Sequence, residues 1–287
     1  MAGQVIIALD GLAFGLLLYC VAAGLSLSLG VAGVFQLGHG AFYLAGTCLA
    51  WWLAEEGSWR GFSAALVVGA AAGAVAGGGL GDVLRHLREH LDQALATIGF
   101  GLILVDILTA SYGAQPRAVE PPPGLGGSIG VLGRSYPTYR LIVIAVAAVL
   151  ATVLYLVIER SRPGILVRAV AADPDYVAAL GVQPRRVQVV VMAAGGALTV
   201  SAGVLGAPIL GPSPGLDSTM LTLSLIVVVA GGLDSIRGAL FAALAVGQIQ
   251  TTAAVAWPSA APFLLFAVLI AGLTWRTRRH ANTVRVT

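Results

Sequence analysis

The polar side chains that could do chemistry are few, and most lie inside long apolar runs. Between residues 11 and 54 the only titratable group apart from cysteine and tyrosine is His39, which stands between Gly38 and Gly40. Such glycines can interrupt a membrane helix, and the backbone groups freed there bind the charged ends of ligands. We therefore expect a substrate pathway at this point, with the candidate residues Ser26, Ser28, Gln36, His39 and Thr47. The alternative is structural, with His39 bonded to a neighbouring carbonyl that holds a kink.

Two aspartates stand near the ends of apolar runs. Asp106 lies five residues before Ser111. Its carboxylate either reaches the membrane interface or, at mid-span, joins the substrate pathway in an uncharged or paired state. Asp10 lies at the edge of the first run, and we expect it to be solvated.

Other kinds of chemistry are disfavoured. All 16 basic residues are arginine, so the chain lacks the lysine with which a P-loop contacts the phosphates of ATP. His86 and His90 have a spacing that suits a metal. The acidic third ligands on offer are only Glu89 and Asp92, and two basic residues stand nearby, so we expect an amphipathic connector on the inner side instead. Cys20 and Cys48 lie in apolar runs, which indicates small buried side chains rather than a disulfide. No Ser/His/Asp set indicates an intramembrane enzyme.

The composition places these residues in a membrane. Of the 287 residues, 58% are hydrophobic and only 10% are charged, whereas soluble domains average about 25% charged residues. The long continuous apolar runs favour helices over a barrel, whose strands would alternate. We predict an all-α, polytopic integral membrane protein with eight or nine transmembrane helices, one of them broken near His39. The predicted spans are residues 11–54 as two helices, then 61–81, 93–111, 141–158, 187–216 and 218–233, and finally 238–275 as a hairpin broken at Trp257-Pro258.

Arginine placement predicts the orientation, because basic residues collect in cytoplasmic loops. With the C-terminus inside, the inner segments hold Arg85, Arg88, Arg160, Arg162, Arg168, Arg185, Arg186, Arg237, Arg276, Arg278, Arg279 and Arg285. The outer segments hold only Arg60, Arg117, Arg134 and Arg140. We therefore expect one transmembrane domain over residues 1–287. Its cytoplasmic loop would be 159–187, its Pro-rich extracytoplasmic loop 112–138 and its cytoplasmic tail 276–287.

The inner loop contains the signals of a short helix. Asp173 suits an N-cap, Pro174 suits the first helical turn, and Gly181 suits the C-terminal cap. A helix over residues 174–180 would be too short to be stable alone, so we expect it to dock on another surface.

Regularly spaced glycines predict close helix packing. They recur every four residues at positions 69, 73, 77 and 81, and Gly11 and Gly15 repeat the spacing once. On a helix each set forms a groove where a second backbone can approach. We expect these grooves to serve packing.

Four stretches stand in order along the chain. They are Gly24–Gly30 with Leu37-Gly-His-Gly40, then Thr97-Ile-Gly99-Phe-Gly-Leu, then Arg162-Pro-Gly164 through Ala179-Leu-Gly181, and last Ala230-Gly-Gly-Leu-Asp-Ser235-Ile-Arg-Gly238. Together they resemble the high-affinity branched-chain amino acid ABC permeases, of the leucine-isoleucine-valine type. The middle stretch and the long Pro-rich loop are more similar to the family's first permease subunit.

The resemblance implies a permease subunit of the cytoplasmic (inner) membrane that is not an enzyme. It would import branched-chain amino acids together with a second homologous permease subunit, two cytoplasmic ATPase subunits and an extracytoplasmic solute-binding protein. Membrane lipids would surround it, and no nucleic acid is implied. It would hold no cofactor, since ATP and Mg would bind to the ATPases.

The resemblance also implies roles for particular residues. Those implied in ATPase coupling are Arg162, Gly164, Arg168, Asp173, Asp175, Tyr176 and Gly181. Those implied in a structural turn are Gly231, Gly232, Ser235 and Gly238. We expect the short helix in the inner loop to carry the motion that the ATPases generate.

Other functions stay open at this point. Permeases of this fold also move urea, short amides and sugars, and the sequence discriminates poorly among them. A stand-alone secondary transporter or channel is a further alternative. A coupled carrier usually needs buried acids at mid-span, where only Asp106 could stand.

Overall fold

A computed structural model describes residues 2–54, 57–87, 89–113, 115–131, 133–232, 235–256 and 267. Its helices are α1 (Ala2–Gly30), α2 (His39–Leu53), α3 (Trp59–Leu84), α4 (His90–Tyr112), α5 (Thr138–Arg160), α6 (Arg162–Ala172), α7 (Pro174–Ala179), α8 (Pro184–Gly206), α9 (Leu216–Gly231) and α10 (Ile236–Ala256). The strands are β1 (Ser128–Val131) and β2 (Arg134–Pro137). Within these residues, 6 helices are long and apolar enough to cross a membrane. The chain is therefore an all-α, polytopic membrane protein.

The predicted interruption between residues 11 and 54 is confirmed. α1 ends at Gly30 and α2 begins at His39, with an irregular segment between them. α1 begins at Ala2, well before the expected start, because Asp10 is paired inside the protein and the helix continues through it. At 15 and 16 residues, α2 and α9 are shorter than the long spans. The second half of the predicted 238–275 hairpin lies outside the described residues, apart from Ala267.

One helix and one hairpin were not predicted from the sequence. α6 occupies the first part of the inner loop, where Ser161 acts as its N-cap and accepts a hydrogen bond from the backbone N–H of Gly164. In the outer loop β1 and β2 form an antiparallel hairpin, with Gly133 at φ +80° in the turn. The predicted Pro-rich outer loop therefore contains a short hairpin, which the sequence did not indicate because its exposed polar and glycine residues do not show the alternating pattern of strands.

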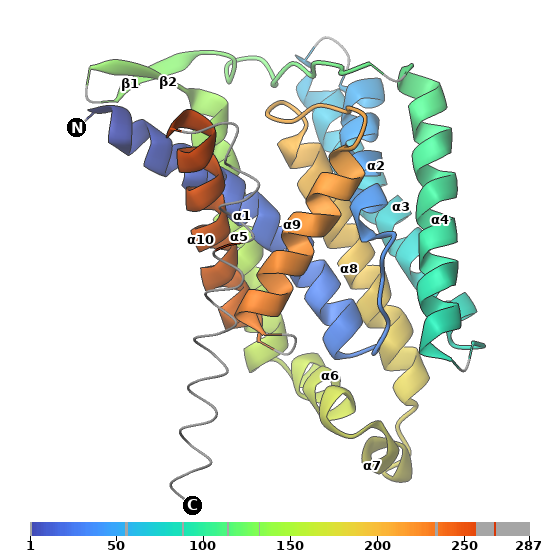
Figure 1. The fold of residues 1–287 in the computed structure, drawn as a ribbon. Helices are drawn as coiled ribbons and strands as arrows, with labels where there is room; N and C mark the ends of the chain where they lie inside the picture. Colours follow the sequence, from blue (N-terminus) through green and yellow to red (C-terminus); the bar gives the residue numbers. More distant parts are fainter. Residues whose placement is uncertain are drawn as a thin grey trace, which may run out of the picture.

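The predicted glycine grooves are confirmed as packing surfaces. α3 packs against α8, and a Cβ added at Gly73 would lie 2.5 Å from the carbonyl oxygen of Gly196. α1 packs against α10 in the same way, since a Cβ at Gly15 would lie 3.0 Å from the carbonyl oxygen of Ala243. Only glycine lets these backbones approach so closely. α1 also contacts α5, α8 and α9, so it lies at the centre of the bundle (Figure 1).

The bundle has two distinct ends (Figure 1). At one end α6 and α7 lie below the helices, and we call it the arginine-rich end. It carries Arg85, Arg160, Arg162, Arg168, Arg185, Arg186 and Arg237, by the bounds of the helices that they belong to or follow. The β1–β2 hairpin lies at the other end, the hairpin end, together with Arg60, Arg117, Arg134 and Arg140. Arg88 and the four arginines of the predicted tail lie outside the described residues.

Candidate functional site

Four polar side chains meet at the break between α1 and α2. This central cluster consists of Ser28, Gln36, His39 and Thr199, all of them buried. The Nδ1 atom of His39 lies 3.2 Å from Gln36 Oε1, and its Nε2 atom lies 2.8 Å from Thr199 Oγ1. Ser28 Oγ donates to Gln36 Oε1 at 2.8 Å. The cluster therefore joins α1, the irregular segment, α2 and α8 into one hydrogen-bonded unit.

The irregular segment between α1 and α2 is also held by α4. Thr97 Oγ1 lies 2.9 Å from the carbonyl oxygen of Phe35 and accepts from the backbone N–H of Leu37 at 3.2 Å. A Cβ at Gly101 would lie 2.7 Å from the Cα of Gly38, so the two backbones touch. Two of the sequence stretches that carry the family resemblance therefore meet in space.

These contacts favour the structural interpretation of His39. Its Nε2 atom lies 3.1 Å from the carbonyl oxygen of Val21, and the ring is fully buried. Val21 lies within α1, so this contact ties the start of α2 to the middle of that helix. Gln36 Nε2 is buried, and no partner for it is found among the described residues.

The other predicted pathway residues lie elsewhere. Thr47 Oγ1 donates to the carbonyl oxygen of Leu44 on its own helix. Ser26 lines a cavity at the arginine-rich end, together with Arg168 of α6. Asp106 lies on the exposed face of α4, between the exposed side chains of Ile103 and Ile107. The structure thus brings together Ser28, Gln36 and His39 but not Ser26, Thr47 or Asp106.

Sequence reasoning missed Thr199, and it gave Thr97 only as part of the middle stretch, without a role at this site. Thr199 lies 160 positions from its partner His39, in a run that reads as ordinary span. A weak signal was present, because Gly195 and Gly196 precede it and mark a close helix contact. A Cβ at Gly24 would lie 2.8 Å from the carbonyl oxygen of Gly195, which places that contact beside the central cluster.

The arginine-rich end carries an exposed patch on α7. The predicted cap is present, since Asp173 Oδ1 accepts from the backbone N–H of Tyr176 at 2.9 Å. Gly181, next to the C-cap, has φ +85°, which favours glycine. Val177 is buried, whereas Tyr176 and Leu180 are 65% and 67% exposed. Helical spacing in the sequence would place these three side chains on one side, and that interpretation is wrong, because only Val177 packs on the bundle.

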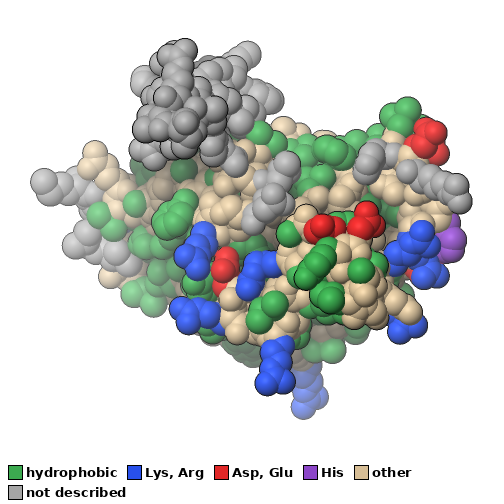
Figure 2. All heavy atoms as spheres, turned by 90° about the horizontal axis from the view of Figure 1, so that it is seen from below, with side chains coloured by type: hydrophobic (Ala, Val, Ile, Leu, Met, Phe, Trp, Pro, Cys, Tyr) green, Lys and Arg blue, Asp and Glu red, His purple; other side chains and the backbone are tan. Residues whose placement is uncertain are grey.

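The corner between α5 and α6 explains two more residues. A Cβ at Gly164 would lie 2.1 Å from the carbonyl oxygen of Ile158, so only glycine fits where α6 crosses the end of α5. Arg168 donates to the same carbonyl oxygen through Nη1. Arg162 and Asp175 are exposed. Basic, acidic and hydrophobic side chains lie exposed together on this end of the molecule (Figure 2).

The turn between α9 and α10 brings its four predicted residues together. Gly232 has φ +101°, and Ser235 Oγ accepts from the backbone N–H of Gly238 at 2.9 Å. A Cβ at Gly238 would lie 1.9 Å from the carbonyl oxygen of Gly231. The glycines therefore let the start of α10 cross the end of α9 at contact distance. Asp234 lies outside the described residues.

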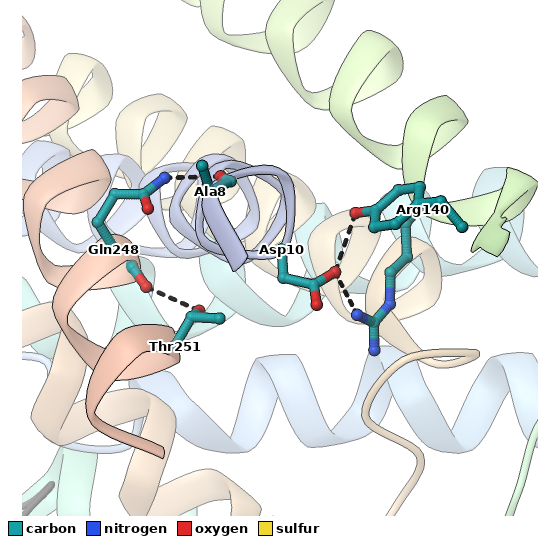
Figure 3. Close-up of polar contacts among 7 residues, drawn as sticks. Ala8, Asp10, Arg140, Gln248 and Thr251 are labelled. Atoms are coloured by element: carbon teal, nitrogen blue, oxygen red, sulfur yellow. Dashed lines mark hydrogen bonds and ion pairs between the residues drawn. The ribbon is translucent and has the colours of Figure 1, made fainter. Parts of the chain in front are cut away.

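Asp10 is not simply solvated as expected. Figure 3 shows its carboxylate directed at Arg140 of α5, whose Nη1 forms an ion pair with Oδ1. The same Oδ1 accepts a hydrogen bond from the phenol of Tyr136 at 2.9 Å. Burial raises the pKa of Tyr136, and the bond to Asp10 raises it further, so the phenol stays protonated and donates. This ion pair ties α1 to α5 and to the hairpin.

Comparison with known proteins finds a family that matches almost the whole chain. The family described as "Branched-chain amino acid transport system / permease component" matches residues 7–273. The permease protein LivH of Salmonella typhimurium, from a high-affinity branched-chain amino acid transport system, is 24% identical over 261 residues, which cover 84% of this chain and 83% of LivH. BraD of Pseudomonas aeruginosa, with the same description, is 24% identical over 255 residues, which cover 84% of this chain and 83% of BraD.

A solved structure was also compared. PsaBC from Streptococcus pneumoniae in complex with Fab aligns over 92% of this chain and 88% of that chain, with 12% identity and a TM-score of 0.47. The family match is far more specific than this likeness. Since it spans residues 7–273, the chain belongs to the branched-chain amino acid transport permease family and is an ABC transporter permease component, not itself an enzyme.

Proposed function

We propose that this chain is a permease subunit of an ABC importer that carries branched-chain or related small amino acids across the cytoplasmic membrane. Separate ATPase subunits hydrolyse the ATP, and this chain binds no cofactor of its own. The observation that carries the proposal is the exposed patch on α7, where Tyr176 and Leu180 are exposed. It lies at the arginine-rich end, which shows basic, acidic and hydrophobic side chains on its surface (Figure 2). Exposed apolar side chains with a charged rim are typical of docking surfaces.

The arginine-rich end also indicates how the protein is oriented in the membrane. Basic residues collect on the cytoplasmic side, so α6 and α7 face the cell interior and the β1–β2 hairpin faces outward. Within the described residues α2 and α9 add to the six long helices, with α2 as the second half of the broken segment, and the span predicted after Trp257-Pro258 lies outside those residues. The whole of residues 1–287 is then one transmembrane domain, and its C-terminal tail is cytoplasmic.

The coupling step depends on how α6 and α7 are seated. α6 contacts the end of α5, and both α6 and α7 contact α8. Arg168 and Gly164 fix α6 to the carbonyl oxygen of Ile158, and the Asp173 cap holds α7 together. A displacement of α7 by an ATPase subunit is therefore passed to α5 and α8 rather than absorbed in a loop.

The proposed partners follow from this arrangement. Two ATPase subunits bind the arginine-rich ends of a permease pair, in which this chain is the first subunit and a homologous chain the second. An extracytoplasmic solute-binding protein delivers substrate at the hairpin end. The alternatives are an importer for another small solute, such as urea, an amide or a sugar, and a stand-alone secondary transporter.

Copurification and reconstitution test the proposal. The full chain, extracted in detergent from its own membrane, should bring down ATPase subunits and a second permease. In liposomes the complex should take up leucine only with ATP and the solute-binding protein. Leucine uptake by the chain alone, without ATP, would contradict the proposal, and ATP-driven uptake of urea or a sugar instead of leucine would replace the substrate.

A matched pair of variants tests the docking surface. Tyr176→Ala with Leu180→Ala should lower the recovery of ATPase subunits several-fold, because exposed aromatic and aliphatic anchors dominate interface energies. The control is Ile129→Ala on the hairpin, which is 48% exposed and lies at the opposite end. Equal recovery from both variants would place the ATPase contact elsewhere.

A further inference from the structure

A cavity of about 380 Å³ lies towards the hairpin end, between α1, α5, α9, α10 and the connector from α8 to α9. Its volume falls within the range of about 300–1,000 Å³ that is common for small-molecule sites. Most of its wall is apolar, with Phe14, Met220 and Leu223 among the lining residues. The ionisable side chains in the wall are Asp10 and Arg140.

This ion pair has bonding capacity left over. Arg140 Nη1 and the Tyr136 phenol both bond to Oδ1 of Asp10, and no bond to Oδ2 is found within the described part of the chain. The side chains of Arg140 and Asp10 are 34% and 23% exposed. The wall of the cavity therefore offers both an anionic acceptor and a cationic donor, which Figure 3 shows side by side.

Gln250 of α10 supplies a second acceptor. Its Oε1 atom is buried and has no hydrogen-bond partner in the described residues, although the side chain lines the cavity. Its neighbours on α10 are satisfied, since Gln248 Nε2 donates to the carbonyl oxygen of Ala8 and Thr251 Oγ1 donates to that of Gly247 (Figure 3). A buried acceptor without a donor is costly, and in native proteins it calls for an explanation.

These groups select one kind of ligand. An ammonium needs acceptors, which Gln250 and Asp10 provide, and a carboxylate needs a fork of donors, which Arg140 provides. The apolar wall suits an aliphatic side chain and offers little to a sugar, whose hydroxyls each need a partner. We propose that this cavity binds a small aliphatic amino acid as its zwitterion, so that the permease itself contains a selective substrate site on its outer half. This inference rests on the proposed import function.

The test is binding to the full-length complex in nanodiscs, with the solute-binding protein left out. L-leucine should bind, whereas isocaproate, which lacks the ammonium, and isoamylamine, which lacks the carboxylate, should bind at least about ten-fold more weakly, because hydrogen bonds to charged groups are strong. Gln250→Leu should weaken leucine binding by a similar factor. Gln250→Glu, which keeps an acceptor and adds a charge, should bind leucine at least as well as the unmodified protein.

A second readout locates the ligand. The Thr219 side chain lines the same cavity and is exposed. In a Thr219→Cys variant, leucine should slow the reaction of the thiol with a small maleimide, and isoamylamine at the same concentration should not. Equal leucine binding by the Gln250→Leu and Gln250→Glu variants would overturn the proposed site. So would a Thr219→Cys thiol that leucine does not protect from the maleimide.

The two proposals fail in different ways. ATP-driven leucine uptake that is indifferent to Gln250→Leu, at normal thermal stability, would overturn the cavity site and leave the import function standing. Leucine binding that depends on Gln250, in a chain that recovers no ATPase subunits and takes up leucine without ATP, would support the cavity site and overturn the import function.

Discussion

At the scale of single residues, His39 is a joint between helices. Its ring contacts Gln36, Thr199 and the carbonyl oxygen of Val21, in a site without exposed surface. The sequence predicted Gln36 and His39 as leading residues of a substrate pathway, and in the structure the two side chains contact each other. It could not predict Thr199, since a lone threonine in an apolar run has no local mark of a partner 160 positions away. For the same reason Asp10 was misjudged, because its cation comes from α5.

His39→Ala should therefore destabilise the protein. The substitution leaves buried polar groups without a partner, which costs about 1–3 kcal/mol each, and also opens a cavity. Thermal unfolding in detergent measures the effect. Thr199→Val is the matched control, and it should cost less, since single hydrogen bonds inside membrane proteins average about 0.6 kcal/mol. An unchanged melting temperature in His39→Ala would show that the joint is not structural.

At the scale of elements, glycine spacing predicted the packing of α3 better than any polar residue did. The groove on α3 was predicted from the four-residue spacing of its glycines alone. In the structure this groove is where α3 packs against α8. What the sequence could not give was the partner helix, because a groove does not identify what fills it. α6 was missed because its 11 residues include two arginines, so the segment was interpreted as part of a basic loop.

Gly73→Ala should destabilise the α3–α8 contact. The new Cβ would lie 2.5 Å from the carbonyl oxygen of Gly196, and overpacking of this kind costs about 1–3 kcal/mol. Gly79→Ala on the same helix meets nothing within 4 Å, so it should leave stability unchanged or raise it slightly. Thermal unfolding of the two variants compares them directly. Equal melting temperatures would contradict the close approach of the two backbones.

The cap of α7 makes a separate prediction. Asp173→Ala removes the acceptor for the backbone N–H of Tyr176, and loss of an N-cap typically costs about 1 kcal/mol. Amide hydrogen exchange over residues 174–180 in the intact complex should therefore become faster. Asp173→Asn keeps an acceptor and should exchange as the unmodified protein does. Equally fast exchange in both variants would contradict the prediction that this capping hydrogen bond stabilises α7.

At the scale of the whole molecule, the two ends of the bundle differ in what they present. The arginine-rich end presents α7 with its exposed Tyr176, and the hairpin end holds the cavity beside Asp10 and Arg140. α1 runs between them at the centre of the bundle, and α5 joins the ion pair at one end to α6 at the other. Under the proposed coupling, a displacement of α7 would reach the cavity through α6 and α5, which contact one another in turn.

Topological labelling in intact cells tests this account most directly. Cys20 and Cys48 are buried, so an added cysteine should give the main signal with a membrane-impermeant thiol reagent. Ser128→Cys on the hairpin should be labelled in intact cells, and Tyr176→Cys should be labelled only after the cytoplasmic membrane is opened. Labelling of Tyr176→Cys in intact cells would put α7 on the wrong side for any ATPase and contradict the account.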